Sequence, residues 1–441
     1  MITSLFTGMY NAVRGLQHAQ TAVTVHGSNI AHANDTAYTR RQVLTPTEAG
    51  ITGPGIARIR DLFIDQQYRS VSASLGEAEA RQDVLSKVED ILGDPVAGGL
   101  RKALDEFFDA WQALADDPTS GVARLQVLSA GRQFVNEIRT AYRGFAELQE
   151  TVNDDLVDNM REVNNLLNQV FELNKRISYL TRNQMNDADL RDLRDLALDK
   201  LAKLVGATAT EGEDGVVRIT VGSTSVLYGP TVLTLVMGAT GQPVWQSADG
   251  TQHPYTGGGV IAGLVSVRDE ELQTLKQEIA LLARQVAEAV NRLHSDPPFF
   301  VDTDNPWKLA VNPDLTPDKI MTGPSGLPSD GEIARQIAAL ATEGIDGWDS
   351  SSIVTQALMT PGTFYQNLVG WVGIKAADAN LSYEVARTHL AAEEEQRQAS
   401  WGVSLDEEVA GMMMQQKAYA ACARLITVMD EMLQTLIDAI R

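Results

Sequence analysis

The sequence predicts a mainly α protein with a small β insertion: a long helical bundle and coiled coil formed by both chain ends, plus a mostly antiparallel β domain. Long stretches at both ends and in the middle carry apolar residues at alternating three- and four-residue intervals, which is typical of helices packed along a seam. Residues 206–261 instead contain short β-branched runs separated by Gly, Asp and Pro. With 441 residues, of which 44% are hydrophobic, the chain has enough material for large cores and for about three domains.

The N-terminal element is predicted to be a coiled-coil helix over residues 1–34, because capping and turn-forming residues follow at Asn34, Asp35 and Thr36. The residues on its predicted seam are Ile2, Phe6, Met9, Val13, Leu16, Gln20, Val23, Gly27 and Ile30. The pattern is lost over 41–65, where "GITGPGIARI" indicates an extended loop with short strands or a hairpin.

A helical bundle domain is predicted over 35–205, continued by 262–298 and 363–403. Loops are expected at Gly93-Asp94-Pro95 and Asp116-Asp117-Pro118. The longest helix is predicted from near Gly121 to about Leu180, and at 1.5 Å per residue it is roughly 90 Å long. Such a rod needs partner helices along its length. Its seam runs through Val135, Ile138, Tyr142, Phe145, Gln149, Val152, Leu156, Asn159, Val163, Leu166, Val170, Leu173, Ile177 and Leu180.

A small β domain is predicted over 206–261 from the runs "VVRITVG", "SVLYG", "TVLTLVMG" and "PVWQS". Helix returns after it, with a seam between Leu272 and Leu293. Residues 299–362 are rich in Pro, Asp and Gly and are expected to be irregular and packed on the bundle or the β domain. A short helix is predicted within them at 331–342.

The C-terminal coiled-coil helix is predicted over 404–441, beginning at a capping box in which Ser404 and Glu407 bond each other's backbone N–H groups. Because both ends of the chain carry matching seams, each is the simplest partner for the other. Gln20 and Gln416 either fix the register of the pair or are merely tolerated. The predicted C-terminal seam consists of Leu405, Val409, Met412, Gln416, Tyr419, Ala423, Ile426, Leu433, Ile437 and Ile440.

The run Met412–Met414 has two interpretations. Three successive residues cannot face one partner helix, so the helix either touches several neighbours, as in a packed assembly, or is loosely specified at its surface.

The net charge of −22 argues against nucleic-acid binding, which needs a basic surface. Residues 1–69 differ from the rest, since six arginines stand against four acidic residues. This excess can pair with the acidic tail or an acidic neighbour, or it can be accidental. The one cysteine, Cys422, excludes an intramolecular disulfide. Neither a cleaved signal peptide nor a run long enough to span a bilayer is visible, so no membrane insertion is expected.

No catalytic, metal or cofactor pattern emerges from the sequence, and we expect a structural protein that is not an enzyme. His18, His26 and His32 are interpreted as solvated helix positions rather than ligands, and Cys422 as a packing residue. A different class of function stays open for the β domain, as a surface enzyme or carbohydrate-binding module. Its only candidate residues are His253, Trp245 and Tyr255.

The segment "SNIAHANDTAYTRRQ" resembles the N-terminal motif shared by the axial proteins of the bacterial flagellum, namely its rod, hook and hook-associated proteins. Ala37 departs from the Gly that is usual there, so the turn before Tyr38 can differ in geometry. The matching positions are Ser28, Asn29, Ile30, Ala31, Asn34, Tyr38 and Arg40.

Three further segments resemble the flagellar hook-associated protein 1 (FlgK) family: 116–134, 257–272 and the C-terminal "GVSLDEEVAGMMMQQKAYAACARLITVMDEMLQTLI". Gly411 departs from the polar residue common at its position. The matching C-terminal positions are Gly402, Val403, Leu405, Asp406, Glu407, Glu408, Gln416, Tyr419, Ala421, Ala423 and Ile426.

The resemblance implies a structural adaptor between the flagellar hook and filament that forms a ring through its terminal helices. The implied partners are other copies of the chain, the flagellar hook protein, hook-associated protein 3 and an export chaperone that binds the C-terminal helix. The implied route is secretion through the flagellum's own channel, to an extracellular flagellum or, in a spirochaete, a periplasmic one. Within the resemblance, another axial protein (hook, rod or hook-associated protein 3) is the alternative. Outside it, a cytosolic coiled-coil scaffold is a less favoured alternative.

The resemblance also places the assembly interface on the two terminal seams and the motif between them. We expect the thin terminal helices to become firmly ordered only on docking with neighbouring subunits. The interface residues expected are Phe6, Met9, Val13, Leu16, Gln20, Val23, Ile30, Asn34, Tyr38, Arg40, Leu405, Val409, Met412, Gln416, Tyr419, Ala423, Ile426, Leu433 and Ile437.

Overall fold

The computed structural model describes residues 2–35, 37–44, 55–93, 99–212, 214–325, 327, 329–354 and 356–440. The predicted turn residues Thr36, Asp94 and Pro95 lie outside them, as do the first part of "GITGPGIARI" and the side chains of Ile2 and Ile440. The chain divides into two units. Unit 1 comprises Met1–Leu75, Met160–Gly259 and Ala386–Arg441, and unit 2 comprises Gly76–Asn159 and Val260–Val385.

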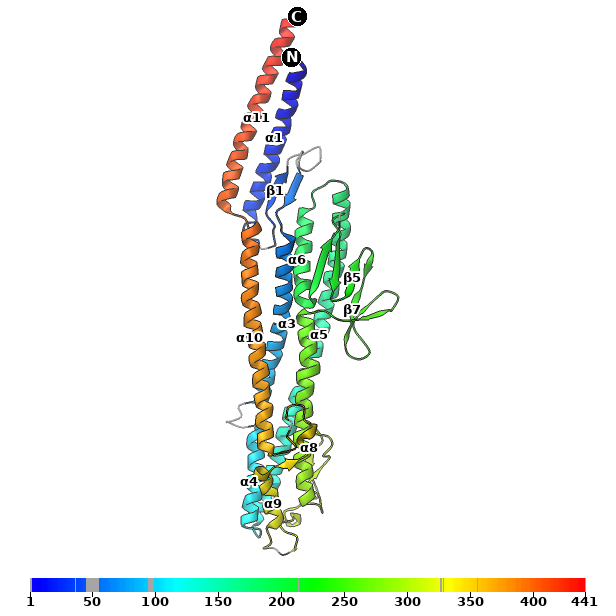
Figure 1. The fold of residues 1–441 in the computed structure, drawn as a ribbon, viewed down its shortest axis with the longest axis vertical. Helices are drawn as coiled ribbons and strands as arrows, with labels where there is room; N and C mark the ends of the chain where they lie inside the picture. The colour runs from blue at the N-terminus through cyan, green and yellow to red at the C-terminus, as the bar shows by residue number, and fades with distance from the viewer. Residues whose placement is uncertain are drawn as a thin grey trace. The chain divides into compact units, whose positions relative to one another are not determined.

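Three long helices contribute residues to both units: α3 (Leu62–Leu92), α5 (Gly121–Arg182) and α10 (Pro361–Trp401) (Figure 1). Helix α5 confirms the longest helix predicted from the sequence, which was expected from near Gly121 to about Leu180. Its seam is buried from Val135 to Ile177 at ten of its apolar positions, which explains why the spacing is so regular. The mainly α prediction with a small β insertion is confirmed.

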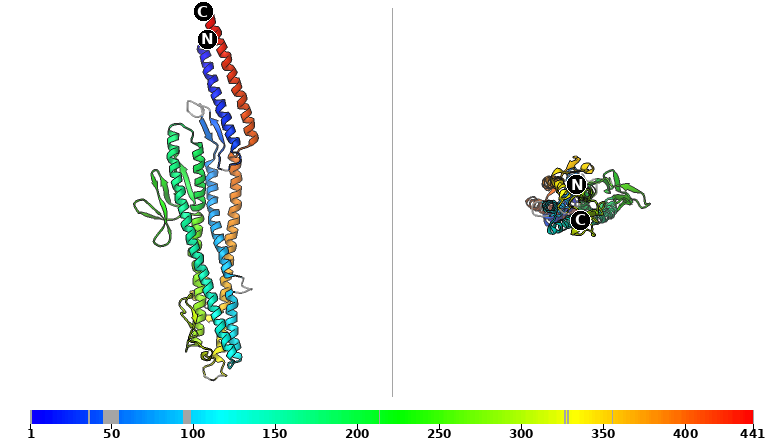
Figure 2. Two further views of the ribbon diagram at one scale, coloured as in Figure 1. Left: turned by 180° about the vertical axis from the view of Figure 1, so that it is seen from behind. Right: turned by 90° about the horizontal axis from the view of Figure 1, so that it is seen from below.

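Unit 1 contains both ends of the chain. Helix α1 (Ile2–Ala31) and helix α11 (Leu405–Ile440) lie side by side and run in opposite directions, so that the N- and C-termini are found at the same end of the pair (Figures 1 and 2). The predicted pairing of the two chain ends is confirmed. After α1, strands β1 (Arg41–Leu44) and β2 (Gly55–Arg58) form the predicted antiparallel hairpin, with Arg41 opposite Arg58.

The β domain of unit 1 follows helix α6 (Ala188–Val205), which ends at Gly206 in the left-handed conformation that glycine favours. One antiparallel sheet has four strands in chain order, and a second has three. The first comprises β3 (Ala207–Glu211), β4 (Val217–Val221), β5 (Thr224–Tyr228) and β6 (Thr231–Val232). The second comprises β7 (Thr234–Met237), β8 (Pro243–Gln246) and β9 (Gln252–Pro254).

Two asparagines of α5 attach these sheets to the helix. The amide of Asn174 donates to the Val217 carbonyl (2.8 Å) and accepts from the Val217 N–H (3.1 Å). Asn164 makes the same pair of bonds to Leu235, at 2.9 and 2.7 Å. Each side chain thus replaces a neighbouring strand and satisfies backbone groups that the sheets leave unpaired.

Unit 2 is built around α4 (Gly99–Asp116), most of α7 (Gly259–Ser266), the π-helical turn η1 (Val267–Glu271) and α8 (Leu272–Leu293). Helix α9 (Glu332–Glu343) confirms the short helix predicted in the irregular stretch. The remaining short elements are β10 (Phe300–Val301), β11 (Ala310–Val311), η2 (Pro317–Lys319), β12 (Ile345–Asp346), η3 (Trp348–Ser350) and β13 (Leu358–Met359). The core of unit 2 is an aromatic cluster of Phe107, Trp111, Phe134, Phe299 and Phe300.

Candidate assembly interface of the terminal helices

Small side chains form the contact between α1 and α11. On α1 the residues that face α11 follow a regular four–three spacing: Gly8, Ala12, Gly15, Ala19, Ala22, His26 and Asn29. The approach is close, since a Cβ atom added at Gly15 would lie 2.9 Å from Sγ of Cys422. Cys422 is thus a packing residue, as predicted.

Four contacts define the register of the pair. Gly8 lies against Met429, Gly15 against Cys422, His26 against Gly411, and Asn29 against Glu408. In every one of these pairs the two residue numbers add up to 437, as expected for antiparallel helices that keep a constant register. The contact therefore extends over nearly the whole length of α1.

The predicted apolar seams do not face each other. We call the row of residues through which each helix contacts the other its contact line. On both helices, each predicted seam residue comes one position after a residue of the contact line, so the seam side chains flank the contact. The exposed ones are Phe6, Val13, Gln20, Leu405, Val409, Gln416, Tyr419 and Ile437, and the half-buried ones are Met9, Leu16, Val23, Ile30, Met412, Ala423, Ile426 and Leu433. Hydropathy favours large apolar side chains, whereas the closest helix packing uses glycine and alanine, which is why the predicted contact was wrong.

The two flanking seams lie on the same side of the helix pair. In an antiparallel pair, residues that follow the contact line by one position on each helix share one face. A cavity of about 280 Å³ confirms this, because Gln20 and Val23 of α1 line it together with Gln416 and Tyr419 of α11. The two seams therefore form one continuous surface, which we call the apolar face. The two seam glutamines meet on it.

The flagellar-type motif after α1 is organised by one buried side chain, Asn29. Its amide nitrogen donates to the Arg41 carbonyl (3.0 Å) and to Oε2 of Glu408 (2.9 Å). Its amide oxygen accepts from the Tyr38 hydroxyl (2.7 Å) and from the Arg41 N–H (3.1 Å). An asparagine side chain can make four such bonds, so Asn29 is fully satisfied and fixes the turn.

The C-terminal motif meets the N-terminal motif at Glu408. This carboxylate is 1% exposed and accepts hydrogen bonds from Nδ1 of His26 and Nε of Arg40, both at 2.6 Å, as well as from Asn29. Burial raises the pKa of Glu408, but the three hydrogen bonds outweigh that effect and hold the pKa below its usual value. One buried charge therefore joins α11 to α1 and to the segment after it.

Two predictions about this junction were wrong. His26 is not a solvated position, because its ring contacts Glu408 and packs over Gly411. Glu407 does not close a capping box, because its carboxylate turns to the guanidinium of Arg40, 3.1 Å away. Both errors have one cause: the partner comes from the other end of the chain, where no local pattern indicates it.

The remaining predicted motif residues lie beside the junction. The ring of Tyr38 stacks on His32 with centroids 4.7 Å apart, and the Arg41 guanidinium lies 4.6 Å from the Tyr38 centroid. Asn34 is exposed and lines a cavity of about 550 Å³ together with Tyr38, Arg40 and Glu407. The structure thus brings Tyr38 and Arg40 into the junction and leaves Asn34 at its edge.

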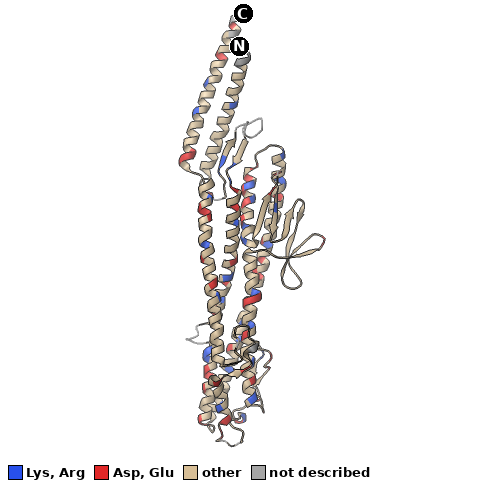
Figure 3. Cartoon of the chain, viewed as in Figure 1, with Lys and Arg blue, Asp and Glu red and all other residues tan. Residues whose placement is uncertain are grey.

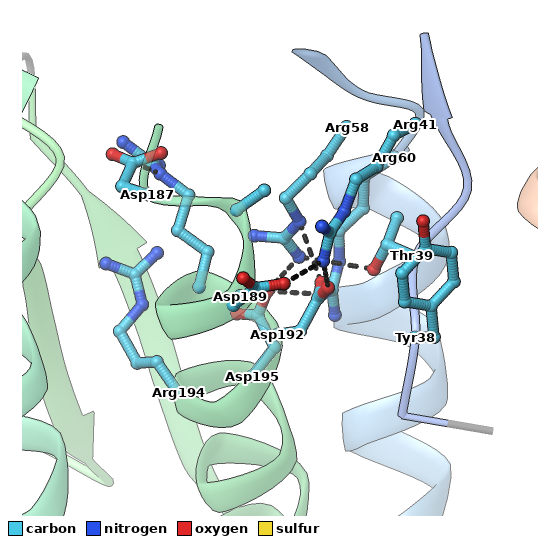
Figure 4. A network of polar contacts seen from close by, with 12 residues as sticks. Tyr38, Thr39, Arg41, Arg58, Arg60, Asp187, Asp189, Asp192, Arg194 and Asp195 are labelled. Atoms are coloured by element: carbon cyan, nitrogen blue, oxygen red, sulfur yellow. Dashed lines mark hydrogen bonds and ion pairs between the residues drawn. The ribbon is translucent and has the colours of Figure 1, made fainter. Parts of the chain in front are cut away.

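A network of arginines and aspartates attaches the β1–β2 hairpin to α6 (Figure 4). Arg41 contacts Asp189 (2.6 Å) and Asp192 (2.9 Å), and Arg58 contacts Asp192 (3.0 Å) and Asp195. Much of the basic excess of residues 1–69 therefore forms ion pairs with the aspartates of α6, an acidic neighbour in the same unit.

Asp195 is at the centre of this network. Burial raises its pKa, but Arg60, Arg58, Arg69 and Arg194 outweigh burial and lower the pKa to about 2. The same network includes α10, because Arg397 contacts Asp199 (2.8 Å) and Asp65 (3.2 Å). A charged cluster of this kind gives the hairpin a defined position.

The described residues offer little basis for other site types. Within them, no group of three His, Cys, Asp or Glu side chains is arranged to hold a metal ion. No helix among the described residues is both long and apolar enough to cross a bilayer. In the β domain, the fully buried side chain of Trp245 packs near Tyr255, and His253 lies opposite Trp245 on the neighbouring strand.

Two family models match the chain. The model described as "Flagellar hook-associated protein FlgK helical domain" matches residues 85–297. The model described as "Flagellar basal body rod FlgEFG protein C-terminal" matches residues 395–439, which include α11. Together with paired terminal helices joined by the flagellar motif, these matches place the chain in the class of flagellar axial proteins.

Relatives with known names indicate which kind of flagellar axial protein this chain is. A relative named flagellar hook-associated protein 1 from Bacillus subtilis is 25% identical over 509 residues, covering 99% of either chain. Relatives of the same name from Salmonella typhimurium and Escherichia coli are 25% identical and cover 65% and 64% of this chain. This chain spans 56% of the length of each of those two relatives. The chain belongs to the FlgK family of flagellar hook-associated proteins and is a structural component of the flagellum.

Among solved structures, the chain is similar to the flagellar hook junction protein FlgK from Burkholderia pseudomallei, with a TM-score of 0.46 and 22% identity. The match covers 52% of this chain and 43% of that one.

Proposed function

We propose that this protein joins the flagellar hook to the filament as a ring of identical subunits that contact one another through their terminal helices. The observation that carries the proposal is the apolar face, on which large side chains of α1 and α11 lie together and uncovered. Phe6 is 53% exposed and Tyr419 is 40% exposed, although both belong to heptad-spaced seams. Apolar surface of this extent on paired helices is typical of an interface.

The packing of the pair supports assembly through this face. The small residues between α1 and α11 bury little apolar area, so the pair gains limited stability from its own contact. Additional copies that cover Val13, Leu16 and their neighbours supply the missing burial. Folding of the helix pair and incorporation into the ring are then one step, restricted to the site where other subunits are already in place.

The proposed partners follow from this placement. Other copies of the chain cover the apolar face within the ring, the hook protein lies on one side and hook-associated protein 3 on the other. Before export, a chaperone covers the exposed apolar residues of α11. The protein is secreted through the flagellar export channel and acts outside the cytoplasm. The interface residues are those of the two seams together with Tyr38, Arg40 and Asn34.

A matched pair of substitutions tests the proposal. Val13→Asp places a charge on the apolar face, whereas Gln17→Asp makes the same change on an exposed position of α1 away from that face. In cells that lack the native gene, we expect Val13→Asp to give hooks without filaments and to release filament protein into the medium. Gln17→Asp should give normal filaments. The readouts are electron microscopy of the cells and an assay of the medium.

The opposite result overturns the proposal. If Val13→Asp cells carry normal filaments, the apolar face is not the assembly interface. A second candidate function, that of a rod or hook protein, is favoured only by the rod-protein model that matches α11. Deletion of the gene separates the two functions, because loss of a rod or hook protein removes the hooks themselves, whereas loss of a junction protein leaves them in place.

A further inference from the structure

A cavity of about 510 Å³ lies beside helix α6, and every residue that lines it belongs to unit 1. Two strands that are far apart in the sequence contribute to its walls, β2 with residues 56–58 and β3 with residues 209–211. Residues of α6, of the first turns of α3 and of the segment before α3 line most of the rest. A cavity of this volume is within the range of pockets that bind ligands.

The edge of β3 that adjoins this cavity has free backbone groups. Strand β3 pairs with β4 on one side, and hydrogen-bonded and non-hydrogen-bonded residues alternate along such an antiparallel ladder. The Gly212 N–H bonds the Val216 carbonyl just beyond the two strands, so the even-numbered residues of β3 are the hydrogen-bonded ones. Ala209 and Glu211 therefore point their N–H and C=O groups away from β4. These groups have no hydrogen-bond partner among the described residues.

The cavity also adjoins the free edge of β2. The Ile59 N–H bonds the Arg40 carbonyl at the base of the hairpin, so Ile56 and Arg58 point their backbone groups away from β1. Within the described part of the chain, these groups also lack a hydrogen-bond partner. Two free strand edges thus adjoin one cavity. Since a free edge is a template for pairing with another extended segment, the cavity is suited to an added strand.

Ion pairs hold both walls of the cavity on the same helix. Glu211 of β3 contacts Arg194 of α6 at 2.7 Å, and Arg58 of β2 contacts Asp192 of α6 at 3.0 Å. Both strand edges therefore have defined positions along α6. A site that is formed in advance costs less free energy to occupy than one that must first be ordered.

The charges around the cavity are balanced. Figure 3 shows basic and acidic residues close together along α6. Four arginines and four acidic residues line the cavity: Arg58, Arg60, Arg69, Arg191, Asp65, Asp187, Asp195 and Glu211. Small uncharged side chains also line it, including those of Ala57, Ala188 and Ala209. An extended segment with little charge of its own therefore suits this lining better than a strongly acidic or basic one.

The connection between β1 and β2 has this chemistry. Residues 45–54 read "TPTEAGITGP", with Glu48 as the one charged residue and seven residues between the two prolines. That run contains β-branched Thr and Ile, which strands favour. A hairpin connection needs only about two to five residues, so these ten exceed what the hairpin requires. Residues 45–54 lie outside the described residues.

We propose that residues 45–54 of each subunit in the ring occupy the cavity of the next subunit as an added strand that pairs with the edge of β3. A segment that continues the line of β1 and β2 points away from the cavity of its own subunit, because that cavity lies beside β2. Ten residues that run out and back reach roughly 16 Å beyond the hairpin. The hairpin end and the cavity are different surfaces, so their contact repeats head to tail, as in a closed ring. The inference rests on the proposed ring.

Single-cysteine variants in a Cys422→Ser background test the contact. One chain carries Ala49→Cys, and a second, tagged chain carries Thr210→Cys at the cavity. Both are expressed together in cells that lack the native gene, and isolated hooks with filaments are treated with a short bis-maleimide. We expect a covalent dimer of a tagged and an untagged chain, which neither variant gives when expressed alone. Thr231→Cys in the tagged chain is the control and should give no dimer, because Thr231 is exposed on β6, the opposite edge of the same sheet.

A proline in the tagged chain tests the strand pairing. Ala209→Pro removes an N–H group that the ladder between β3 and β4 does not use, so the β domain should still fold. We expect it to lower the cross-linked fraction by about fivefold, because the added strand loses one backbone hydrogen bond. Ala209→Ser keeps the N–H group and should leave the cross-linked fraction unchanged.

The outcomes separate this inference from the proposed function. Normal filaments without the dimer overturn the inference and leave the proposed function intact. So does a chain with both Ala49→Cys and Thr210→Cys that cross-links only within itself. Equal cross-linked fractions for Ala209→Pro and Ala209→Ser overturn the pairing with β3. If the parental Cys422→Ser chain does not enter the junction, the proposed function and the inference fail together.

Discussion

The terminal helix pair and the aromatic core of unit 2 show two different ways of packing. Around Phe107, five aromatic rings have centroids 5.3 to 6.4 Å away, and Phe107 itself is fully buried. Between α1 and α11 the closest contacts involve Gly, Ala and one polar junction, while the large side chains of the two seams flank the contact and are exposed or half-buried. The aromatic core is completed within the chain, whereas the apolar surface of the helix pair is not. This difference is why we assign assembly to the pair.

The largest effect should come from the aromatic core. Phe107→Ala removes a fully buried ring and leaves a cavity, which should lower the free energy of unfolding of this region by about 3–5 kcal/mol. Phe6→Ala, on the exposed face of α1, should change it by less than about 0.5 kcal/mol in the free protein. Denaturant unfolding followed by tryptophan fluorescence compares the two. Equal losses would show that α1 is packed as firmly as the core.

The next largest effect should come from the junction of the pair. Glu408→Gln removes the buried charge that Arg40 and His26 contact, and we expect α11 of the assembled protein to lose about 2 kcal/mol of protection against amide exchange. Its neighbour provides the control, because the Glu407 side chain is 64% exposed and Glu407→Gln should cost less than about 0.5 kcal/mol. If both variants behave alike, Glu408 does not hold the pair together.

A smaller effect should follow from acidification. The pKa of Glu408 is lower in the folded protein than in the unfolded chain, so its contribution is fully present above its ordinary pKa and is lost as the pH falls through the folded pKa. The protection factors of α1 and α11, which compare the measured amide exchange rates with the intrinsic rates at the same pH, should therefore fall in acid, in the assembled native protein more than in assembled Glu408→Gln. The aromatic core of unit 2 should show no matching change. An identical acid response in the variant would contradict this account.

The sequence was sufficient for the parts of the fold that repeat. The seam of α5, the strand runs of the β domain, the hairpin after α1 and the short helix α9 all have local patterns, because each is formed by residues close together in the chain. The resemblance of the motif around Asn29 and Tyr38 to flagellar axial proteins also pointed to the right family.

The sequence was not sufficient for contacts between distant residues. Glu408 and Asn29 are 379 positions apart, and nothing near either residue indicates the other. The aspartates of α6 look like an ordinary solvated face until Arg41 and Arg58 are placed on them. The contact line of α1 was missed for another reason: Gly15 and Ala19 have little hydrophobicity, although their size is what lets the two helices approach.

The central claim is that the terminal pair is incomplete in the free protein and is completed by other subunits. Its most direct test is amide hydrogen exchange of the free, dilute full-length protein, compared with the same protein assembled on isolated hooks. We predict fast exchange along α1 and α11 in the free state, slow exchange in the buried part of α5, and strong protection of both terminal helices after assembly. Terminal helices that are as protected as α5 in the free protein would contradict the claim.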